Sequence, residues 1–151
     1  MVTALGPRLI EFNCRFGDPE AQVLMMRMKS DIVPYLDAIA RGELDELRHG
    51  PEWEPWPAAC VVAVSEGYPG KYEKGRRIEN IYEHEDTDDL VIFHAGTERR
   101  IDGHCYTSGG RVFAVTAKAP ALGKALDKCY GTLERVRFAG MGYRTDIGRR
   151  G

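Results

Sequence analysis

A proline-rich stretch about a third of the way along the chain limits most strongly how this sequence can fold. Residues 49–57 read His-Gly-Pro-Glu-Trp-Glu-Pro-Trp-Pro, with three prolines in nine residues. Proline lacks a backbone N–H and disfavours helical backbone in the residue before it, so this stretch should be extended and non-helical. We therefore predict a linker over 49–57, which divides the 151-residue chain into a part over 1–48 and a part over 58–151.

The part before the linker is predicted to hold one strand and two helices. The run 8–12, Arg-Leu-Ile-Glu-Phe, is rich in β-formers and indicates the strand. Pro19 suits the first turn of a helix that continues to Met28, because its missing N–H would be unpaired there in any case. Ser30, which is followed by an aspartate, suits the start of a second helix that ends at Gly42.

The part after the linker is rich in strands and ends in a helix. The short apolar run 59–64 is typical of a buried strand, and Asp102-Gly103 is a strong hairpin signal. Apolar residues at helical spacing over 121–138 predict a helix that covers the sheet. The fold class predicted for the whole chain is therefore α+β, with a small antiparallel sheet in this part. Further strands are expected over 77–82, 90–94, 98–101, 104–107 and 111–117.

Charge and composition exclude several classes of protein. The formal net charge of −2 gives no general attraction for nucleic acid or an anionic membrane. The apolar run 60–64 is far shorter than the ~20 residues of a membrane-spanning helix, and the start of the chain lacks the features of a signal peptide. The cysteines form no C-x-x-C pair, so we expect reduced thiols in a cytoplasmic protein and no metal site built on them. They are Cys14, Cys60, Cys105 and Cys129.

The densest group of chemically active side chains lies over 11–20. On a strand, residues two apart point to the same face, so Glu11, Asn13 and Arg15 would project together. Carboxylate and amide oxygens suit Mg²⁺, and a guanidinium can clamp a phosphate or a carboxylate. Gly17-Asp18-Pro19 then leads into a helix N-terminus, which favours anions. From the spacing alone, an amphipathic edge strand with a solvated polar face is the preferred interpretation.

Two glycine-rich stretches invite a phosphate-binding interpretation. Residues 67–75 do not fit the pattern G-x-x-x-x-G-K-[ST], so a tight turn between strands is predicted there. Residues 107–111, Thr-Ser-Gly-Gly-Arg, would either present backbone N–H groups and the guanidinium of Arg111 to an anion or form a plain hairpin turn. Both interpretations of 107–111 stay open at this level.

The run Glu-Phe-Asn-Cys-Arg-Phe-Gly-Asp-Pro-Glu-Ala-Gln over 11–22 closely resembles the signature of the glycinamide ribonucleotide synthetase family, also called phosphoribosylamine–glycine ligase. The family has the ATP-grasp fold. The resemblance covers nearly the whole chain from Pro7. It continues, in the family's order, through Gly-Tyr-Pro-Gly at 67–70, Phe-His-Ala-Gly-Thr at 93–97, Gly-Gly-Arg-Val at 109–112 and the stretch 140–148.

The resemblance implies an ATP-dependent ligase of purine biosynthesis. In this reaction the carboxylate of glycine is activated as an acyl phosphate, and the amine of 5-phosphoribosylamine attacks it to give glycinamide ribonucleotide, ADP and phosphate. Glu11 and Asn13 would hold Mg²⁺ or Mn²⁺ ions that bridge the phosphates of ATP. Arg15 would face the transferred phosphoryl group or the glycine carboxylate, and Asp18 would position an amine. Arg111 is a third catalytic candidate, because in the family this domain closes against the ATP-grasp body.

The family enzyme is several-fold longer than this chain. The resemblance therefore implies that 1–48 is the C-terminal remnant of an ATP-grasp domain and that 58–151 is the C-terminal domain. We expect the isolated chain to be inactive and to need the missing N-terminal portion or self-association. The alternative is a non-catalytic scaffold or interaction module. A third interpretation is a small-molecule binder that uses Glu11, Asn13 and Arg15.

Overall fold

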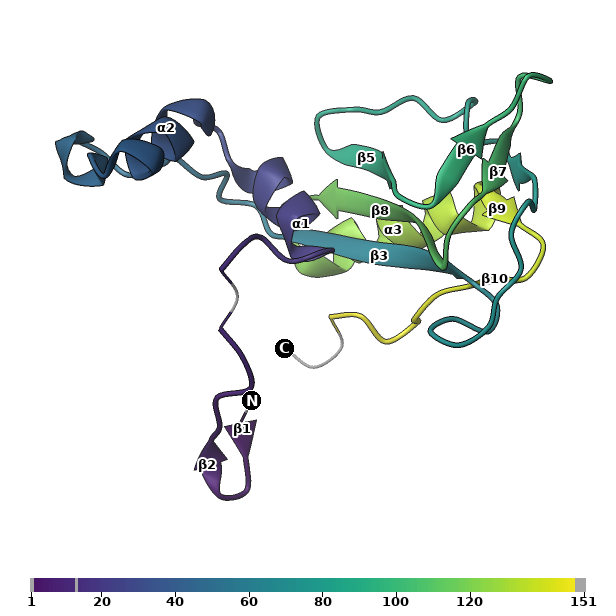
Figure 1. The fold of residues 1–151 in the computed structure, drawn as a ribbon, viewed down its shortest axis with the longest axis horizontal. Coiled ribbons are helices and arrows are strands. Elements are labelled where there is room, and N and C mark those ends of the chain that lie inside the picture. Colours follow the sequence, from purple (N-terminus) through teal and green to yellow (C-terminus); the bar gives the residue numbers. More distant parts are fainter. Residues whose placement is uncertain (1, 13, 149–151) are drawn as a thin grey trace.

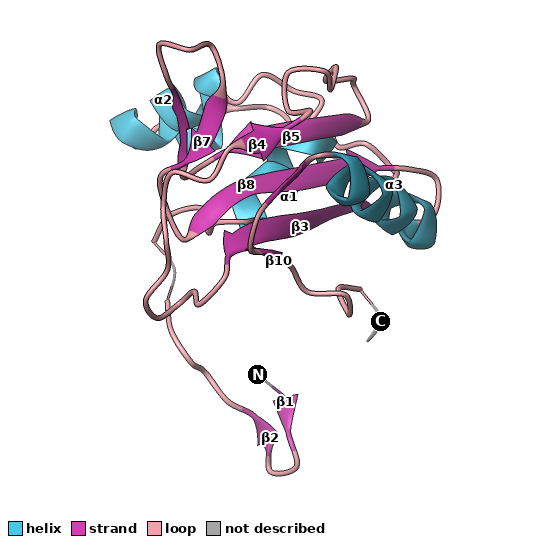
Figure 2. Ribbon diagram, turned by 90° about the vertical axis from the view of Figure 1, so that its right-hand side faces the viewer, coloured by secondary structure: helices cyan, strands magenta, loops and turns pink. Residues whose placement is uncertain are grey.

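The fold centres on an antiparallel sheet with one helix packed on each face. The structure is a computed structural model, and it describes residues 2–12 and 14–148. The sheet has the strand order β10–β3–β8–β5 (Figure 1). Helices α1 and α3 both contact β3 and β8, from opposite sides of the sheet (Figures 1 and 2). The predicted class, α+β, is confirmed. These elements are β3 (Ala58–Ser65), β5 (Leu90–His94), β8 (Arg111–Lys118), β10 (Met141–Gly142), α1 (Glu20–Arg27) and α3 (Leu122–Arg135).

Shorter elements surround this centre. Each of the short strands pairs with one partner in an antiparallel two-stranded ladder, and α2 projects away from the sheet (Figure 1). The pairs are β1 (Val2–Thr3) with β2 (Gly6–Pro7), β4 (Ile78–Glu79) with β9 (Arg137–Phe138), and β6 (Thr97–Arg99) with β7 (Cys105–Thr107). The remaining elements are α2 (Val33–Arg41) and the 3₁₀ helix η1 (Leu44–Glu46).

The core lies between the sheet and α3. Strand β3 alternates as expected for a half-covered strand, with Ala59, Val61 and Ala63 buried against α3. Helix α3 contributes the buried side chains of Cys129 and Leu133 from its apolar stripe. Among the described residues, every fully buried member of this apolar cluster lies between positions 59 and 138. The region after the linker therefore has its own hydrophobic core, whereas the region before it does not contribute to that core.

Gly131 in α3 offers a direct test of helix stability. A Cβ at this position would meet no atom within 4 Å, and the residue is helical. The Gly131→Ala variant should raise the free energy of unfolding by about 0.5–1 kcal/mol, because alanine loses less backbone entropy on folding. Gly103 is the matched control: it has equally open surroundings but a φ of +82°, so Gly103→Ala should lower the free energy by roughly 1 kcal/mol. Urea unfolding measures both, and equal effects of the two changes would contradict the prediction.

A polar contact connects α3 to the sheet. The Nζ of Lys128 on α3 donates to a carboxylate oxygen of Asp89, and the Thr87 hydroxyl donates to the other oxygen at 2.8 Å. These hydrogen bonds favour the charged carboxylate, so the pKa of Asp89 lies below its ordinary value. Asp89 directly precedes β5, so this contact fixes the start of an edge strand against α3.

The Asp89–Lys128 contact predicts a pH dependence of stability. A carboxylate with a lowered pKa in the folded state stabilises the fold above its unfolded pKa of about 3.9, and this stabilisation is lost as the pH falls through the folded pKa. The Asp89→Asn variant should therefore be less stable than the wild type at pH 7. Because both side chains are more than a third exposed, the difference should stay below about 1 kcal/mol. Thermal unfolding at pH 7 and pH 3 checks this, and a difference that grows in acid would contradict it.

Two of the strands expected before β5 differ from prediction. Residues 8–12 form no strand. Their composition favours extended backbone, but a strand also needs a hydrogen-bonded ladder, and this run belongs to none of the ladders among the described residues. Leu9, Ile10 and Phe12 are exposed there. The strand expected over 77–82 is only two residues long, since β9 is its short partner.

The helices before the linker begin and end close to the predicted positions. Helix α1 has Pro19 at its N-terminal cap, and α2 ends at Gly42, whose φ of 73° is left-handed as expected of a C-terminal glycine. The second helix begins at Val33 rather than at Ser30. Its N-cap residue is Ile32, and the Oδ1 of the preceding Asp31 accepts the Val33 N–H at 2.9 Å. Leu36 and Ile39 share a face as predicted, but that face is exposed.

The proline-rich linker runs antiparallel to the end of α1. The N–H of Lys29 donates to the carbonyl of Glu52 at 2.9 Å, and the N–H of Glu54 donates to that of Arg27 at 2.7 Å. The guanidinium of Arg27 also reaches the carbonyls of Glu54 and Trp56. The linker is thus non-helical, as predicted. Its backbone carbonyls accept hydrogen bonds from the end of α1 and so hold that helix in place. None of the described helices is both long and apolar enough to cross a membrane.

Candidate active site

An open pocket lies where the segment before α1 meets the start of β8. Its volume is about 580 Å³, within the range of small-molecule sites. It brings together Glu11, Arg15, Asp18 and Arg111, four of the five predicted site residues. The fifth, Asn13, lies outside the described residues. The pocket thus collects acidic and basic side chains from positions almost a hundred residues apart in the sequence.

Arg111 connects the start of β8 to the segment before α1 at this pocket. Its Nη1 donates to the backbone carbonyl of Asp18 at 2.9 Å, and its Nη2 lies 3.3 Å from the Asp18 Oδ2. The other carboxylate oxygen of Asp18 accepts a hydrogen bond from the Gln22 Nε2 at 3.0 Å. Asp18 is therefore held from both sides, by the guanidinium of Arg111 on β8 and by the amide of Gln22 in the first turn of α1. This arrangement fixes the loop that carries Arg15 relative to the sheet.

The turn before α1 is closed by its own side chains. The backbone N–H of Gly17 donates to the Glu20 Oε2 at 3.2 Å, and the N–H of Ala21 donates to the Gly17 carbonyl at 2.8 Å. Sequence reasoning did not assign Glu20 or Gln22 to the site. Their spacing carried the signal: a Glu three residues after the glycine of the turn, and a Gln four residues after an Asp.

A β-bulge turns Arg111 toward this pocket. Opposite β8, Ala63 pairs with Phe113 and Val64 pairs with Arg111, so Val112 is the extra residue. Phe113 and Val112 are both buried in the core on the α3 side. Without the bulge, simple alternation would place Arg111 on that same face as Phe113. With it, Arg111 lies on the opposite face, where α1 packs and where it contacts Asp18.

Gly96 and Gly109 pack closely against each other beside the backbone of Arg111. The N–H of Gly96 donates to the Arg111 carbonyl at 2.9 Å, and a Cβ on Gly96 would lie only 2.6 Å from that oxygen and from the Gly109 Cα. The strands on either side of residues 108–110 do not pair with each other, because β7 pairs with β6 whereas β8 pairs with β3 and β5. The plain hairpin interpretation of 107–111 is therefore wrong. The segment is a tightly packed crossing between two sheets.

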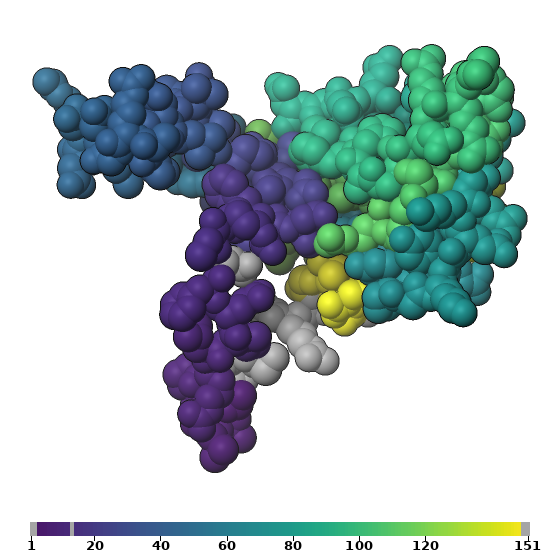
Figure 3. Space-filling view, in the orientation of Figure 1, coloured from purple at the N-terminus to yellow at the C-terminus, as the bar shows by residue number. Residues whose placement is uncertain are grey.

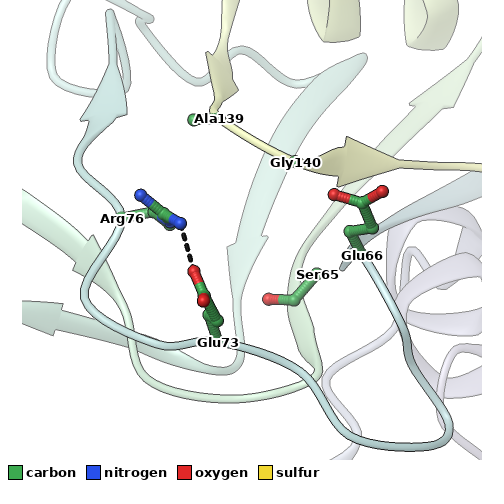
Figure 4. A pocket seen from close by; sticks show the side chains of 6 residues that line it. All are labelled: Ser65, Glu66, Glu73, Arg76, Ala139 and Gly140. Atoms are coloured by element: carbon green, nitrogen blue, oxygen red, sulfur yellow. Dashed lines mark hydrogen bonds and ion pairs between the residues drawn. The ribbon is translucent and has the colours of Figure 1, made fainter.

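Ser65 also stabilises this crossing, through two hydrogen bonds to its carbonyls. Its N–H donates to the Gly110 carbonyl at 2.8 Å, and its hydroxyl donates to the Gly109 carbonyl at 3.0 Å. Ser65 also borders a crevice of about 170 Å³ near the ion pair of Glu73 with Arg76 (Figure 4). This crevice is too small for a nucleotide. Its walls support the backbone that presents Arg111.

The glycine-rich stretch 67–75 packs against this crossing. It contains the predicted tight turn between strands, since the N–H of Gly70 donates to the Gly67 carbonyl at 2.7 Å, and the chain then continues without regular structure to β4. The rings of Tyr68 and Tyr72 lie so close to Gly110 that a Cβ there would come within 2.3 Å and 2.9 Å of them. The two rings thus cover the glycines that precede Arg111.

The donor groups in the pocket fit a divalent cation that is bound together with phosphate. Glu11, Asp18 and Glu20 line the pocket with hard carboxylate oxygens. Mg²⁺ commonly takes only one or two protein carboxylates and completes its shell with phosphate and water. Within 2–12 and 14–148, no group of three His, Cys, Asp or Glu side chains gathers to bind a metal by protein ligands alone. A role for Glu11 in a shared metal–phosphate site stays a prediction, as does that of Asn13.

Comparisons with known proteins agree with the resemblance. Residues 58–150 match the family described as "Phosphoribosylglycinamide synthetase, C domain". The phosphoribosylamine–glycine ligase of Caulobacter vibrioides is 48% identical over 99% of this chain and 35% of its own length. The chloroplastic ligase of Arabidopsis thaliana is 46% identical over 95% of this chain and 27% of its own length. The crystal structure of the Thermotoga maritima ligase superposes with a TM-score of 0.70 and 30% identity, covering 97% of this chain and 34% of that one.

The match extends through both parts of the chain, from the pocket segment to the C-terminal helix and beyond. The chain spans about a third of the length of the curated relatives it matches. It corresponds to their C-terminal portion. This chain belongs to the phosphoribosylamine–glycine ligase family and contains the C domain characteristic of its members.

Proposed function

We propose that this chain supplies the C-terminal part of an ATP-dependent ligase that joins glycine to 5-phosphoribosylamine. The observation that supports this most is the contact of Arg111 with Asp18 across the pocket. It joins two blocks of the family signature, 93 residues apart in the sequence, into one site with Glu11 and Arg15. The reaction itself is inferred from the names of relatives three times as long, so it belongs to the proposal.

In the proposed reaction the carboxylate oxygen of glycine attacks the γ-phosphorus of ATP, and ADP leaves. The nitrogen of 5-phosphoribosylamine then attacks the acyl carbon, a C–N bond forms, inorganic phosphate leaves and the amine loses a proton. Glu11, with Asn13, would hold Mg²⁺ or Mn²⁺, which would neutralise charge on the ATP phosphates during transfer. Arg15 would pair with phosphoryl or glycine carboxylate oxygens. Asp18 would keep the loop in place through Gln22 and Arg111.

The chain by itself does not enclose a nucleotide. The pocket is open, and two metal ligands on one segment cannot surround ATP. We therefore propose that residues 1–48 complete an ATP-grasp domain whose remainder corresponds to the unmatched two thirds of the relatives, that 49–57 is a linker and that 58–151 is a separate domain. The free thiols of all four cysteines suit a cytoplasmic location.

An assay of ADP release tests the proposed function. The purified chain is mixed with ATP, Mg²⁺, glycine and fresh 5-phosphoribosylamine, with and without the N-terminal two thirds of the Caulobacter vibrioides relative. We expect ADP release only with both polypeptides and both substrates. Release by the chain alone would contradict the expectation that these residues are inactive by themselves. A folded complex that never turns over would overturn the ligase proposal and favour the non-catalytic scaffold.

Arg111 is expected to act as a positioning residue in this reaction. Arg111→Met should lower kcat/KM of the combined polypeptides by about 10- to 100-fold, the range found when a supporting hydrogen bond behind a metal or catalytic group is lost. Its effect on unfolding should stay below about 1 kcal/mol, since the pair is close to half exposed. Arg100→Met, at an exposed ion pair on the β6–β7 hairpin, is the control. Equal rates for the two variants would contradict the role.

A further inference from the structure

The small crevice at the end of β3 has opposite charges on its two sides (Figure 4). It opens in the sheet domain, the part of the chain that stands apart from the N-terminal segment in the space-filling view (Figure 3). The guanidinium of Arg76 lies on one side, and the carboxylate of Glu66 lies on the other, beside Gly140. Among the described residues Glu66 forms no salt bridge, whereas Arg76 is paired with Glu73. A guanidinium has five N–H donors, so Arg76 can bind a second anion as well.

Ser65 adds a buried hydroxyl to the lining of the crevice. The residue is only 4% exposed, and its hydroxyl donates to the Gly109 carbonyl at 3.0 Å. A hydroxyl whose hydrogen is engaged in this way still accepts hydrogen bonds through its lone pairs. The Glu66 carboxylate and the Ser65 Oγ are therefore both acceptors. Together they suit an ammonium group, which has three N–H donors and no acceptor.

Backbone hydrogen bonds fix the acidic side of the crevice. The N–H of Glu66 donates to the Gly140 carbonyl at 2.7 Å, and the N–H of Ser65 donates to the Gly110 carbonyl at 2.8 Å. Gly140 has a φ of +74°, and a Cβ there would lie 3.3 Å from the Glu66 Oε2. Glycine at 140 thus permits both the turn and the position of the carboxylate. The fold itself therefore holds these acceptors in place.

Size and charge together select the class of ligand. The volume of the crevice is about 170 Å³, below the roughly 300–1,000 Å³ of sites for drug-sized molecules, so only a very small ligand fits. An inorganic ion carries charge of one sign and would leave one side of the crevice without a partner. A small α-amino acid carries a carboxylate and an ammonium group on one carbon atom and so meets both sides. The rest of the lining, Ala139 and Gly140, offers little apolar surface, which favours a short side chain.

We propose that this crevice binds a small α-amino acid, with its carboxylate on Arg76 and its ammonium group on Glu66 and Ser65. The site is distinct from the one to which the ligase reaction is assigned, because the crevice shares no lining residue with the pocket at Glu11 and Arg111. The proposal therefore goes beyond the proposed function, and the two can be tested separately.

An amino acid in the crevice would restrain the crossing over 107–111. Ser65 borders the crevice and at the same time donates to the carbonyls of Gly109 and Gly110. An ammonium group that donates to the Ser65 Oγ would polarise the hydroxyl and so strengthen its hydrogen bond to Gly109. The backbone amide of Ser65 should therefore exchange its hydrogen at least threefold more slowly when the site is saturated, as measured by hydrogen–deuterium exchange.

Titration calorimetry of the chain with L-alanine, without ATP or magnesium, tests the site. For a ligand with so few atoms we expect a Kd on the order of 1 mM. Ethylamine and propionate are the matched probes, because each is L-alanine without one of its two charged groups. Both should bind at least 10-fold more weakly than L-alanine. L-alanine is used rather than glycine, so that binding is not confused with occupancy by the substrate of the proposed ligase.

Two pairs of variants locate the binding. Glu66→Gln and Arg76→Met should each weaken the binding of L-alanine at least 10-fold. Their controls are Glu134→Gln and Arg77→Met, which remove exposed charges outside the crevice and should bind as the wild type does. All four variants should melt with the wild type, since the substituted side chains are exposed.

The Glu73→Gln variant gives a test of opposite sign. The Glu73 carboxylate is paired with Arg76 and so competes with the carboxylate of the ligand. Its removal should tighten the binding of L-alanine by about twofold or more. Binding that falls as far as in Glu66→Gln would overturn the proposed orientation of the ligand.

Three further results would overturn the site. The first is no binding of L-alanine by the wild-type chain, and the second is equal binding of ethylamine or propionate. The third is binding that survives in Glu66→Gln and Arg76→Met but is lost in Arg15→Met, which would place L-alanine in the other pocket. Failure of the proposed function is recognised separately: a chain that shows the expected pattern of affinities but releases no ADP in the combined assay refutes only the ligase reaction.

Discussion

The Glu11→Ala variant, combined with the N-terminal two thirds of the Caulobacter vibrioides relative, should release ADP about 100- to 1000-fold more slowly than the wild type. Glu11 lines the pocket with Arg15 and Arg111, and we propose that its carboxylate helps to hold the cation that neutralises phosphate charge. Removing one group that stabilises developing charge typically costs this much in rate. The loss should appear in kcat, because phosphate charge is redistributed in the transition state.

The control for this change is Glu134→Ala, at an exposed carboxylate on α3. It should leave the rate unchanged, and both variants should unfold at the wild-type temperature, since Glu11 is exposed and outside the core. Undiminished activity of Glu11→Ala would remove this residue from the metal–phosphate site. A shift in the Mg²⁺ concentration needed for half-maximal rate, measured with Glu11→Gln, would separate metal binding from a general loss of charge.

The Gly96→Ala variant should lower the free energy of unfolding by about 2–4 kcal/mol. A Cβ at this position would lie 2.6 Å from the Arg111 carbonyl oxygen and from the Gly109 Cα, both of which are backbone atoms. Backbone cannot rotate aside as a side chain does, so Gly96 and the crossing over 107–111 must move apart. The hydrogen bonds of Gly96 to Arg111 and of Ser108 to Gly96 would be strained with it.

Guanidinium unfolding of Gly96→Ala against Gly123→Ala measures this effect. Gly123 lies in α3, and a Cβ there would meet no atom within 4 Å, so its change to alanine should be neutral or stabilising. Because the same crossing positions Arg111, the Gly96 variant should also lose ligase activity at temperatures where it is still folded. A free energy of unfolding within about 0.5 kcal/mol of the wild type, the usual scatter of surface changes, would show that the crossing is not tightly packed.

Local signals predicted the parts of this fold that depend on neighbouring residues. The alternation of β3, the stripe of α3, the turn at Gly103 and the end of α2 at Gly42 follow from side-chain periodicity and from the few residues that accept positive φ. The strand over 8–12 did not form, because strand propensity needs a partner that the described chain does not provide. The family resemblance supplied what periodicity does not: it named Glu11, Arg15, Asp18 and Arg111 as site residues.

The position of Arg111 shows what the sequence by itself left open. Its place in the alternation of β8 matches that of Phe113 and Val115, which face α3, so a regular strand would bury it in the core. The sequence alone determined that the residue stands at the start of a strand, after two glycines, and carries a permanent charge. The bulge at Val112 and the close approach of Gly96 to Gly109 are contacts between distant segments, and only the tertiary structure decided them. They turn Arg111 to the other face, because a strand's side-chain direction depends on its register with its partner, and there it meets Asp18.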